Sequence, residues 1–475
     1  MTLPRSTPSA QDVDASGLLA FVDAVEAGRL GLHSLMVARH GHVIAEGWWR
    51  PYSADRVHLG YSLSKTLTAT AVGFLVQEGR LSLEDRVLSH FPEYDPATVP
   101  AGWHDVRVKH CLSMTVGHEE DAWAHVFDRM SGMAAAEHDD WVPRVLATEP
   151  TREPGTHFAY NQVATYLLSM IVGRVTGVGL AETLQPRLLS PLGLPDVPWH
   201  RDPLGRELGF TGAHLTTEGI ASVAQLYLDL GRWQGRQLLS DAWVEEASRG
   251  FGPLPEDPGM EPDSSRGYGY SFWMQRHGFR GDGAFGQFLI VLPEHDTVVA
   301  ITAEQDRTQP TLDALWEHVV PAIGRPGSPA ADAALADRLA ALEIPAMAGE
   351  ALGPDYAEFL RSDASDLSAD YTAVSVARAE GGQTLGLLRR DTWLTVPVAS
   401  GGWRESELVG GGARLPVVAS GGWVDEDTFR AEVIAIETPH RFRVEARLRG
   451  GDADLTWRMV PLTGRDPLWL ATRWA

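Results

Sequence analysis

Ser62 and Lys65 are the clearest candidates for catalytic residues, and they lie three positions apart in Gly60-Tyr61-Ser62-Leu63-Ser64-Lys65. The segment that follows has apolar residues at helical spacing, namely Leu63, Leu67, Ala71, Phe74 and Leu75. This stripe predicts a buried helix that begins at Ser62, with Lys65 one turn further on the same face. Backbone N–H groups and positive potential at a helix start stabilise an oxyanion, so the position suits a serine nucleophile.

The rarity of lysine in this chain supports a functional role for Lys65. Lysine occurs only at Lys65 and Lys109, and every other cationic residue is arginine. Arginine keeps its proton in proteins, whereas burial can lower the pKa of a lysine from ~10.4 by several units and turn its amine into a base. The sequence therefore indicates a titratable amine beside Ser62. The alternative is that Ser62 only caps the helix and Lys65 extends to solvent.

A second candidate group lies in the turn-rich segment 154–162, which leads into a predicted buried helix over residues 164–172. Tyr160 and Gln162 stand at the mouth of that helix. If Tyr160 lies near Lys65, the ammonium is expected to lower the pKa of the phenol, which makes Tyr160 a candidate base for the serine proton. The alternative is a packed tyrosine with a hydrogen-bonded hydroxyl.

A third candidate is the glycine-rich stretch Gly281-Asp282-Gly283-Ala284, which precedes a predicted strand over residues 288–292. Repeated glycines allow a backbone to lie against a ligand, so an N–H group of this stretch could complete an oxyanion hole. A glycine-rich hairpin edge without a chemical role is an equal alternative.

The remaining pattern indicates the elements that position these residues. We expect helices over residues 18–27, 218–230, 242–247 and 330–342, and strands over residues 33–38, 43–49, 267–274, 288–292 and 298–302. From about residue 355 short alternating segments separated by Gly-Gly turns predict an all-β module of barrel or sandwich type. Within it, residues 396–403 are echoed by residues 416–423.

Length and composition indicate two domains. A chain of 475 residues is too long for one typical core. We expect a first domain over residues 1–325, a linker over 326–350, rich in alanine, glycine and proline, and an all-β domain over 351–475. The net charge of -23 argues against nucleic acid and anionic membrane surfaces as partners, so a small molecule is the expected partner.

Cysteine and histidine usage gives no support for a metal or another cofactor. The single cysteine, Cys111, excludes an internal disulfide and a cysteine-based zinc site. His118-Glu119-Glu120 matches a zinc-protease motif only in part, because the next histidine, His125, follows after seven residues rather than four. The polar residues 1–13 lack the apolar core of a signal peptide and no window reaches ~18 apolar residues, so the expected location is the cytoplasm.

Taken together, residues 15–325 resemble the serine β-lactamase and penicillin-binding-protein-like hydrolases, in particular the class C-like branch with esterases, D-aminopeptidases and 6-aminohexanoate-dimer-hydrolase-like amidases. The resemblance rests on Ser62-Leu63-Ser64-Lys65 as the S-x-x-K motif, on residues 154–160 as the approach to a Y-x-N motif, and on residues 284–287. Residues 79–85 and 231–239 add support. The fold class that the resemblance implies is α+β: a β-lactamase/DD-peptidase-like domain, with an antiparallel sheet flanked by helices and a helical lobe, followed by a small barrel-like or lipocalin-like domain.

The resemblance also implies roles for individual residues. Ser62 would be the acylated nucleophile, Lys65 and Tyr160 the proton-handling pair, and the backbone N–H groups of Ser62 and Ala284 the oxyanion hole. Gln162 would stand in the substrate-binding place of the Y-x-N asparagine.

This chain departs from the family's third motif. The K-T-G or H-x-G motif falls on Gly281-Asp282-Gly283, which has no cation in first place. A binding group for a penicillin-like carboxylate is therefore not expected there, although Arg280 or His277 is a candidate replacement.

The leading functional hypothesis is hydrolysis of a small ester or amide through an acyl-enzyme on Ser62. One alternative is transfer of the acyl group to an amine, as in penicillin-binding-protein-like peptide cyclases. Another is a catalytically impaired binding protein, which the changed third motif would suit.

Overall fold

The structure, a computed structural model, describes residues 2–126, 140–194, 196–251, 254, 260–349 and 353–474. The chain divides into two compact units, of which the first comprises Met1–Gly47 and Leu59–Ala341 and the second Trp48–His58 and Leu342–Ala475. Helix α12 (Pro329–Ala340), which lies in the expected linker, thus belongs to the first unit.

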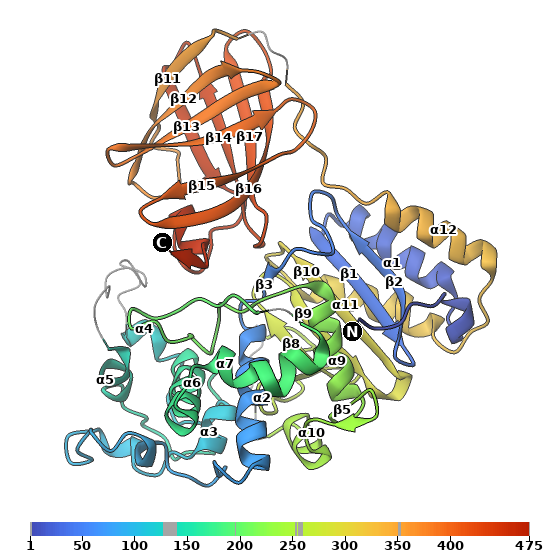
Figure 1. The fold of residues 1–475 in the computed structure, drawn as a ribbon, viewed down its shortest axis with the longest axis vertical. Coiled ribbons are helices and arrows are strands. Elements are labelled where there is room, and N and C mark those ends of the chain that lie inside the picture. Colours follow the sequence, from blue (N-terminus) through green and yellow to red (C-terminus); the bar gives the residue numbers. More distant parts are fainter. Residues whose placement is uncertain are drawn as a thin grey trace. The chain divides into compact units, whose positions relative to one another are not determined.

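A six-stranded sheet is the centre of the first unit (Figure 1). Its order is β2-β1-β10-β9-β8-β7, and antiparallel ladders join β1 to β10 and then β9, β8 and β7 in turn. The strands are β1 (Leu32–Arg39), β2 (His42–Trp48), β7 (Trp273–Met274), β8 (Phe279–Gly283), β9 (Gln287–Leu292) and β10 (Thr297–Ala303). Every residue of β1, β9 and β10 is buried, as expected of strands covered on both faces.

The predicted strand over residues 267–274 is wrong for most of its length, because only Trp273 and Met274 form a strand. The backbone takes positive φ at Gly267 (134°) and at Ser271 (63°), which bends the chain out of an extended ladder. Conversely, the glycine-rich stretch expected before β9 begins as strand β8.

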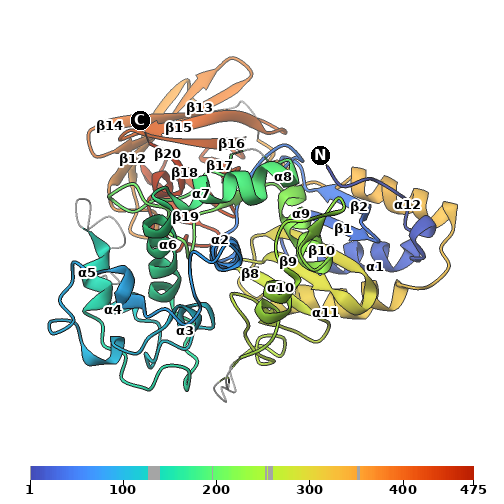
Figure 2. The same ribbon diagram turned by 60° about the horizontal axis from the view of Figure 1, so that its bottom comes forward.

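Helices surround this sheet. They are α1 (Ala15–Ala27), α2 (Leu63–Gln77), α3 (Val108–Leu112), α4 (Trp123–Val126), α5 (Trp141–Leu146), α6 (Gln162–Thr176), α7 (Leu180–Leu184), α8 (Ser190–Leu192), α9 (Thr217–Leu228), α10 (Asp241–Ala247), α11 (Gln309–Ala314) and α12. Helix α1 packs against α11 and α12, whereas α9 packs on β1, β9 and β10. Helix α2 contacts β8 and β9 as well as α6 and α7, so it lies between the sheet and the helical lobe (Figure 2). The antiparallel sheet, flanking helices and helical lobe expected from the sequence are confirmed.

Two short ribbons follow, the first of which begins at the boundary between His58 of the second unit and Leu59 of the first. Strand β3 (His58–Leu59) pairs with β4 (His214–Leu215), and β5 (Arg232–Trp233) pairs with β6 (Arg236–Gln237). The first ribbon is directly before the predicted nucleophile, because the Gly60 N–H donates to the Ala213 carbonyl at 2.8 Å.

The second unit is a closed eight-stranded β-barrel, as expected from its alternating segments. Its strands are β11 (Tyr356–Arg361), β12 (Tyr371–Ala379), β13 (Gly382–Arg389), β14 (Thr392–Ala399), β16 (Ala413–Trp423), β17 (Thr428–Ala435), β18 (Arg441–Arg447) and β19 (Asp452–Trp457), with β15 (Arg404–Gly410) and β20 (Arg473–Trp474) paired to β16. The barrel closes where Ala399 of β14 pairs with Ser420 of β16. Residues 396–399 of the first copy of the sequence echo lie in β14, and the whole second copy, residues 416–423, lies in β16.

The segment Trp48–His58 belongs to the second unit although it precedes Ser62 in the chain. Buried Tyr52 packs with Val418, Ile434 and Ile436, and its hydroxyl donates to the Thr438 carbonyl at 3.0 Å. The apolar pattern of the sequence did not reveal that this segment belongs to the second unit.

In the described part of the chain, no single helix is long and apolar enough to cross a membrane. Helix α6 and the stretch Leu180–Leu192 meet the length and composition test only as a pair, across a bend of 66°.

Candidate active site

The start of α2 presents Ser62 in an unusual local geometry. Tyr61, directly before it, has a positive φ of 47°, which is strained for a residue with a Cβ. The Ser64 hydroxyl donates to the Tyr61 carbonyl at 2.7 Å and accepts from the Ala213 N–H at 2.9 Å, so the turn is held from both sides. Ser62 makes no side-chain capping bond to the helix. Ser62 thus occupies the N-cap position of α2, but its hydroxyl does not cap the helix.

Lys65 is buried, with only 1% of its surface exposed. Its Nζ donates to three acceptors: Ser62 Oγ at 3.0 Å, Gln162 Oε1 at 2.6 Å and the Phe210 carbonyl at 2.9 Å. The same atom lies 4.7 Å from the centroid of the Tyr160 ring. The amine does not extend to solvent, and the structure places it with Ser62, Tyr160 and Gln162.

Burial lowers the pKa of Lys65 to about 7, because the charged ammonium loses its hydration. The negative charge of Asp121 opposes this effect and raises the pKa. Near neutral pH the amine is therefore poised between its charged form and its neutral, basic form.

Tyr160 belongs to the same group, since Lys65 Nζ lies over its ring, and the rise that burial causes in the pKa of its phenol is opposed by hydrogen bonding by the Ser62 side chain. Its ring stacks on Trp273 with a centroid distance of 5.5 Å and meets Tyr268 edge to face at 5.9 Å. The expectation that Lys65 lowers the pKa of this phenol is wrong. Burial raises the pKa of Tyr160, and the charges of Asp282 and Asp121 raise it further, while the bond to Ser62 only partly offsets them. Tyr160 is thus a neutral phenol at physiological pH.

Gln162 reaches Lys65 from the first turn of α6. The side chain of Asn161 caps this helix by accepting from the Val163 N–H at 3.2 Å, which leaves Gln162 as the first helical residue. Its Oε1 accepts the shortest of the three Lys65 bonds. Gln162 therefore supplies a side-chain amide to the lysine.

The glycine-rich stretch lies directly against the start of α2. A Cβ on Gly281 would stand 2.8 Å from Thr66 Oγ1, and a Cβ on Gly283 would stand 2.1 Å from the Gly60 carbonyl oxygen. Only glycine permits this approach of β8 to the turn before Ser62. A lysine or histidine at position 281 would have no room for its side chain.

The turn after β8 faces the turn before α2. Phe285, like Tyr61, has a positive φ, and the two rings are in contact with their centroids 5.2 Å apart. Within the described residues, the backbone N–H groups of Ser62 and Ala284 donate to no protein acceptor. Both N–H groups remain available for an oxyanion.

Arg280 and His277, the candidate replacements for the missing cation, are engaged elsewhere. Arg280 is 1% exposed and donates to Asp282 Oδ2 at 2.8 Å, to the Asp263 carbonyl at 2.9 Å and to Ser264 Oγ at 3.0 Å. The ring of His277 lies against Trp316. The pKa of Asp282 is raised by burial, which outweighs the lowering effect of Arg280.

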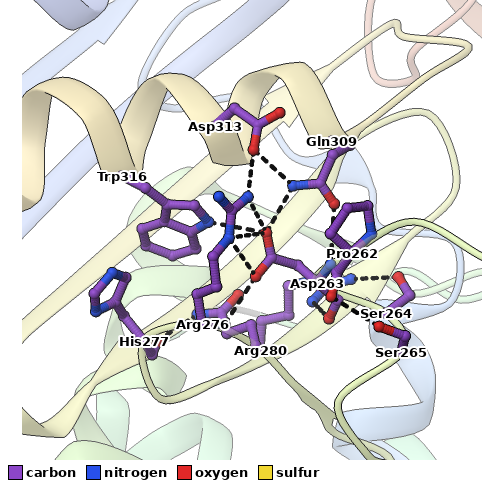
Figure 3. A network of polar contacts seen from close by, with 11 residues as sticks. Pro262, Asp263, Ser264, Ser265, Arg276, His277, Arg280, Gln309, Asp313 and Trp316 are labelled. Carbon is purple, nitrogen blue, oxygen red and sulfur yellow. Dashed lines mark hydrogen bonds and ion pairs between the residues drawn. The ribbon is translucent and has the colours of Figure 1, made fainter.

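A buried polar network supports this side of the sheet (Figure 3). The carboxylate of Asp263 accepts from Arg276 Nη2 at 2.6 Å, from Gln309 Nε2 at 2.6 Å and from Trp316 Nε1 at 2.9 Å. These bonds hold the loop that contains Ser264, and through it the guanidinium of Arg280. The arginine therefore acts in a structural network rather than at Ser62.

Two groups at the site escaped the sequence reasoning. The Phe210 carbonyl accepts from Lys65 although nothing in the local sequence marks this residue. Asp121 lies close enough to change the pKa of both Lys65 and Tyr160. Asp121 follows two other acidic residues, Glu119 and Glu120, so the local sequence does not distinguish it from a solvated loop carboxylate.

No group of histidine, cysteine or acidic side chains that could hold a metal ion occurs among the described residues. His118 is buried, and its Nδ1 lies 2.9 Å from Asn161 Nδ2 in a hydrogen bond. The side chain of His125 lies outside the described part of the structure.

Comparison with known proteins gives a consistent result. The family model described as Beta-lactamase matches residues 20–323. The 6-aminohexanoate-dimer hydrolase of Paenarthrobacter ureafaciens is 28% identical over 279 residues, which cover 56% of this chain and 71% of the hydrolase. Esterase EstB of Burkholderia gladioli is 31% identical over 217 residues, which cover 41% of this chain and 55% of the esterase.

A solved structure extends the likeness to both units. The crystal structure of SurE aligns with 92% of this chain and 97% of its own length, with a TM-score of 0.50 and 19% identity. At that identity the likeness shows the fold alone.

Proposed function

Because the chain belongs to the beta-lactamase family over residues 20–323, we propose that it is a serine hydrolase that cleaves a small ester or amide through an acyl-enzyme. The observation that supports this most directly is the bond of 3.0 Å between the buried Lys65 Nζ and Ser62 Oγ. A lysine whose pKa is lowered to about 7 is matched to proton transfer at neutral pH.

In the proposed first step, the Ser62 oxygen attacks the substrate carbonyl and its proton passes to the neutral amine of Lys65. The N–H groups of Ser62 and Ala284 receive the negative charge that develops on the carbonyl oxygen. Loss of one such donor costs ~3 kcal/mol of transition-state stabilisation in comparable sites.

Tyr160 takes the complementary role of proton donor. Its raised pKa keeps the phenol protonated, and its ring lies beside the Lys65 amine that binds Ser62. As the bond to the leaving group breaks, Tyr160 can give its proton to the departing alcohol or amine and recover one from Lys65. Water then attacks the acyl-enzyme by the reverse route, and Ser62 regains its proton.

The substrate class follows from the relatives and from the third motif. One relative is named as a 6-aminohexanoate-dimer hydrolase and another as an esterase, so an ester or amide bond is the proposed target. Gly281 leaves no room for a cationic side chain, and Asp282 is acidic. Neutral acyl esters are therefore better first substrates than compounds that depend on a carboxylate.

Labelling with a fluorophosphonate, followed by peptide mass spectrometry, tests the proposal. Wild type is expected to carry one adduct on Ser62, whereas Ser62→Ala should carry none and lose nearly all p-nitrophenyl ester hydrolysis. Lys65→Arg keeps the positive charge but removes the titratable base, so it should lose at least ~100-fold in kcat.

Lys109→Arg is the matched control, because Lys109 is the other lysine of the chain and pairs with Glu84 at 2.6 Å. It should keep wild-type activity. Folded wild type without an adduct would refute the hydrolase and leave the binding protein as the better explanation. Amide or ester products formed only on addition of an amine would instead indicate acyl transfer.

A further inference from the structure

The loop between α3 and α4 is fastened to the first turn of α6 by a set of hydrogen bonds. Asp121 Oδ1 accepts from the Gln162 N–H at 3.0 Å and from the Trp123 N–H at 3.1 Å. In return, Asn161 Oδ1 accepts from the Ala122 N–H at 3.3 Å. The backbone of each segment is thus bound by a side chain of the other, which fixes the start of α6 relative to this loop.

These hydrogen bonds hold the backbone of a residue whose side chain binds the proposed base, Lys65. The backbone of Gln162 is held by Asp121, and its side chain accepts from Lys65 Nζ at 2.6 Å. A displacement of the Gln162 backbone would therefore displace the acceptor that orients the lysine. Since a misplacement of ~1 Å at a reacting group can cost ~100-fold in rate, such a contact has consequences for catalysis.

The charge of Asp121 acts on the same amine. Asp121 raises the pKa of Lys65 against the lowering effect of burial. The other groups around Nζ are the Ser62 hydroxyl, the Phe210 carbonyl, the Gln162 amide and the face of the Tyr160 ring. Asp282, on β8, acts on Tyr160. Among the described groups, Asp121 is the carboxylate whose charge raises the pKa of Lys65.

We propose that Asp121 is a positioning residue for the acyl transfer: its carboxylate holds the Gln162 backbone, and so holds the amide that orients the Lys65 amine towards Ser62. At the same time, its negative charge stabilises the protonated form of the same amine. The proposal rests on the function proposed above. It assigns a role to a residue that has no place in the S-x-x-K, Y-x-N or glycine-rich motifs.

Two substitutions separate the hydrogen bonds of Asp121 from its charge. Asp121→Asn keeps an oxygen that can accept from the N–H groups of Gln162 and Trp123 but removes the charge. The ammonium of Lys65 then loses a stabilising partner, so the acidic limb of kcat/KM should move to lower pH while the plateau value of kcat stays within about twofold. Asp121→Ala removes both the hydrogen bonds and the charge. The acidic limb of kcat/KM should therefore move to lower pH, and the plateau value of kcat should fall by at least ~10-fold.

Glu119→Gln is the matched control. It removes one negative charge from the same loop, but Glu119 is on the surface, where it pairs with Arg152 at 2.7 Å. The pH profile of this variant should coincide with that of wild type. The profiles are measured with a neutral p-nitrophenyl ester, and the rate of fluorophosphonate labelling of Ser62 against pH provides a second readout.

An unmoved acidic limb in Asp121→Asn would overturn the proposal, as would an equal movement in Glu119→Gln. A purely structural role would lower the melting temperature of both Asp121 variants without moving the limb. If Asp121→Ala does not fold, Asp121→Asn still decides the matter. Wild type that shows no labelling at Ser62 would instead contradict the proposed function, so the two failures are distinguishable.

Discussion

At the scale of single residues, the chemistry of Lys65 depends on what its environment lacks as much as on what it contains. Its amine has three oxygen acceptors and an aromatic face but almost no contact with water. Oxygen acceptors alone would favour the ammonium, whereas desolvation disfavours it, and here desolvation is the larger effect. The same balance keeps Tyr160 protonated, which separates the two groups into a base and an acid.

This balance predicts the pH dependence of the wild-type enzyme. The proposed base is the neutral amine of Lys65, and the fraction of neutral amine rises with pH through a pKa of about 7. The acidic limb of kcat/KM for a neutral ester should therefore rise about tenfold per pH unit below about 7 and level off above it. Steady-state rates between about pH 5 and about pH 9 measure this limb, and a profile that is flat across that interval would contradict the assignment of Lys65 as base.

At the scale of elements, the site depends on the close approach of β8 to the start of α2. Two glycines of β8 face this helix start, and the side chains of Tyr61 and Phe285 pack across the two adjoining turns. The positive φ of Tyr61 and of Phe285 is consistent with backbone strain that the surrounding packing maintains. Strand and helix together set the position of the two N–H groups proposed for the oxyanion.

Gly283→Ala tests this approach. The new Cβ would meet the Gly60 carbonyl at 2.1 Å, so strand and helix must separate. We expect a loss of about 1–3 kcal/mol in the unfolding free energy of the first unit and a lower kcat, since the Ala284 N–H moves with the strand.

Gly173→Ala is the control for that experiment. Gly173 lies within α6, where the nearest neighbouring atom to a new Cβ would be 3.6 Å away. Alanine should stabilise this helix by ~0.5–1 kcal/mol and leave kcat unchanged. Urea unfolding and ester hydrolysis measure both variants, and a Gly283→Ala enzyme with wild-type stability and kcat would refute the importance of the approach.

At the scale of the whole molecule, the chain does not divide into two consecutive parts. Residues Trp48–His58 belong to the barrel unit, although they stand between β2 and the helix that begins after Ser62. The chain must therefore leave the first unit and return to it before the nucleophile is placed. Folding of the barrel thus involves a segment that is covalently continuous with the turn that contains Ser62, the proposed nucleophile.

Tyr52 offers a test of this arrangement. Removing its side chain by Tyr52→Ala should destabilise the barrel unit by about 3–5 kcal/mol, because Tyr52 is buried against Val418, Ile434 and Ile436. Tyr52→Phe keeps the ring and loses only the bond to the Thr438 carbonyl, so it should cost about 1 kcal/mol. Calorimetry should show the change in the transition of the barrel unit, and a shift confined to the other transition would contradict the assignment of this segment.

Local pattern was sufficient for much of the fold and for the first members of the site. Helical spacing after Ser62 predicted α2, apolar runs bounded by turn residues predicted β1, β2, β9 and β10, alternation predicted the all-β module, and the rarity of lysine pointed to Lys65. These inferences succeed because helix periodicity, strand alternation and residue chemistry are properties of short stretches of sequence. The placement of Gln162 beside Lys65 also agrees with its position in the motif.

The sequence by itself thus determined most of the elements, an all-β second domain of barrel or sandwich type, and the residue types of the site, while its resemblance to a known family implied the antiparallel sheet. Only the tertiary structure decided the direction in which the pKa of Tyr160 moves, the involvement of Asp121 and the Phe210 carbonyl, and the exchange of Trp48–His58 into the barrel. The physical reason is the same in each case. Desolvation, charge at a distance and backbone acceptors depend on every segment that packs around a group, and no neighbouring residue in the sequence encodes them.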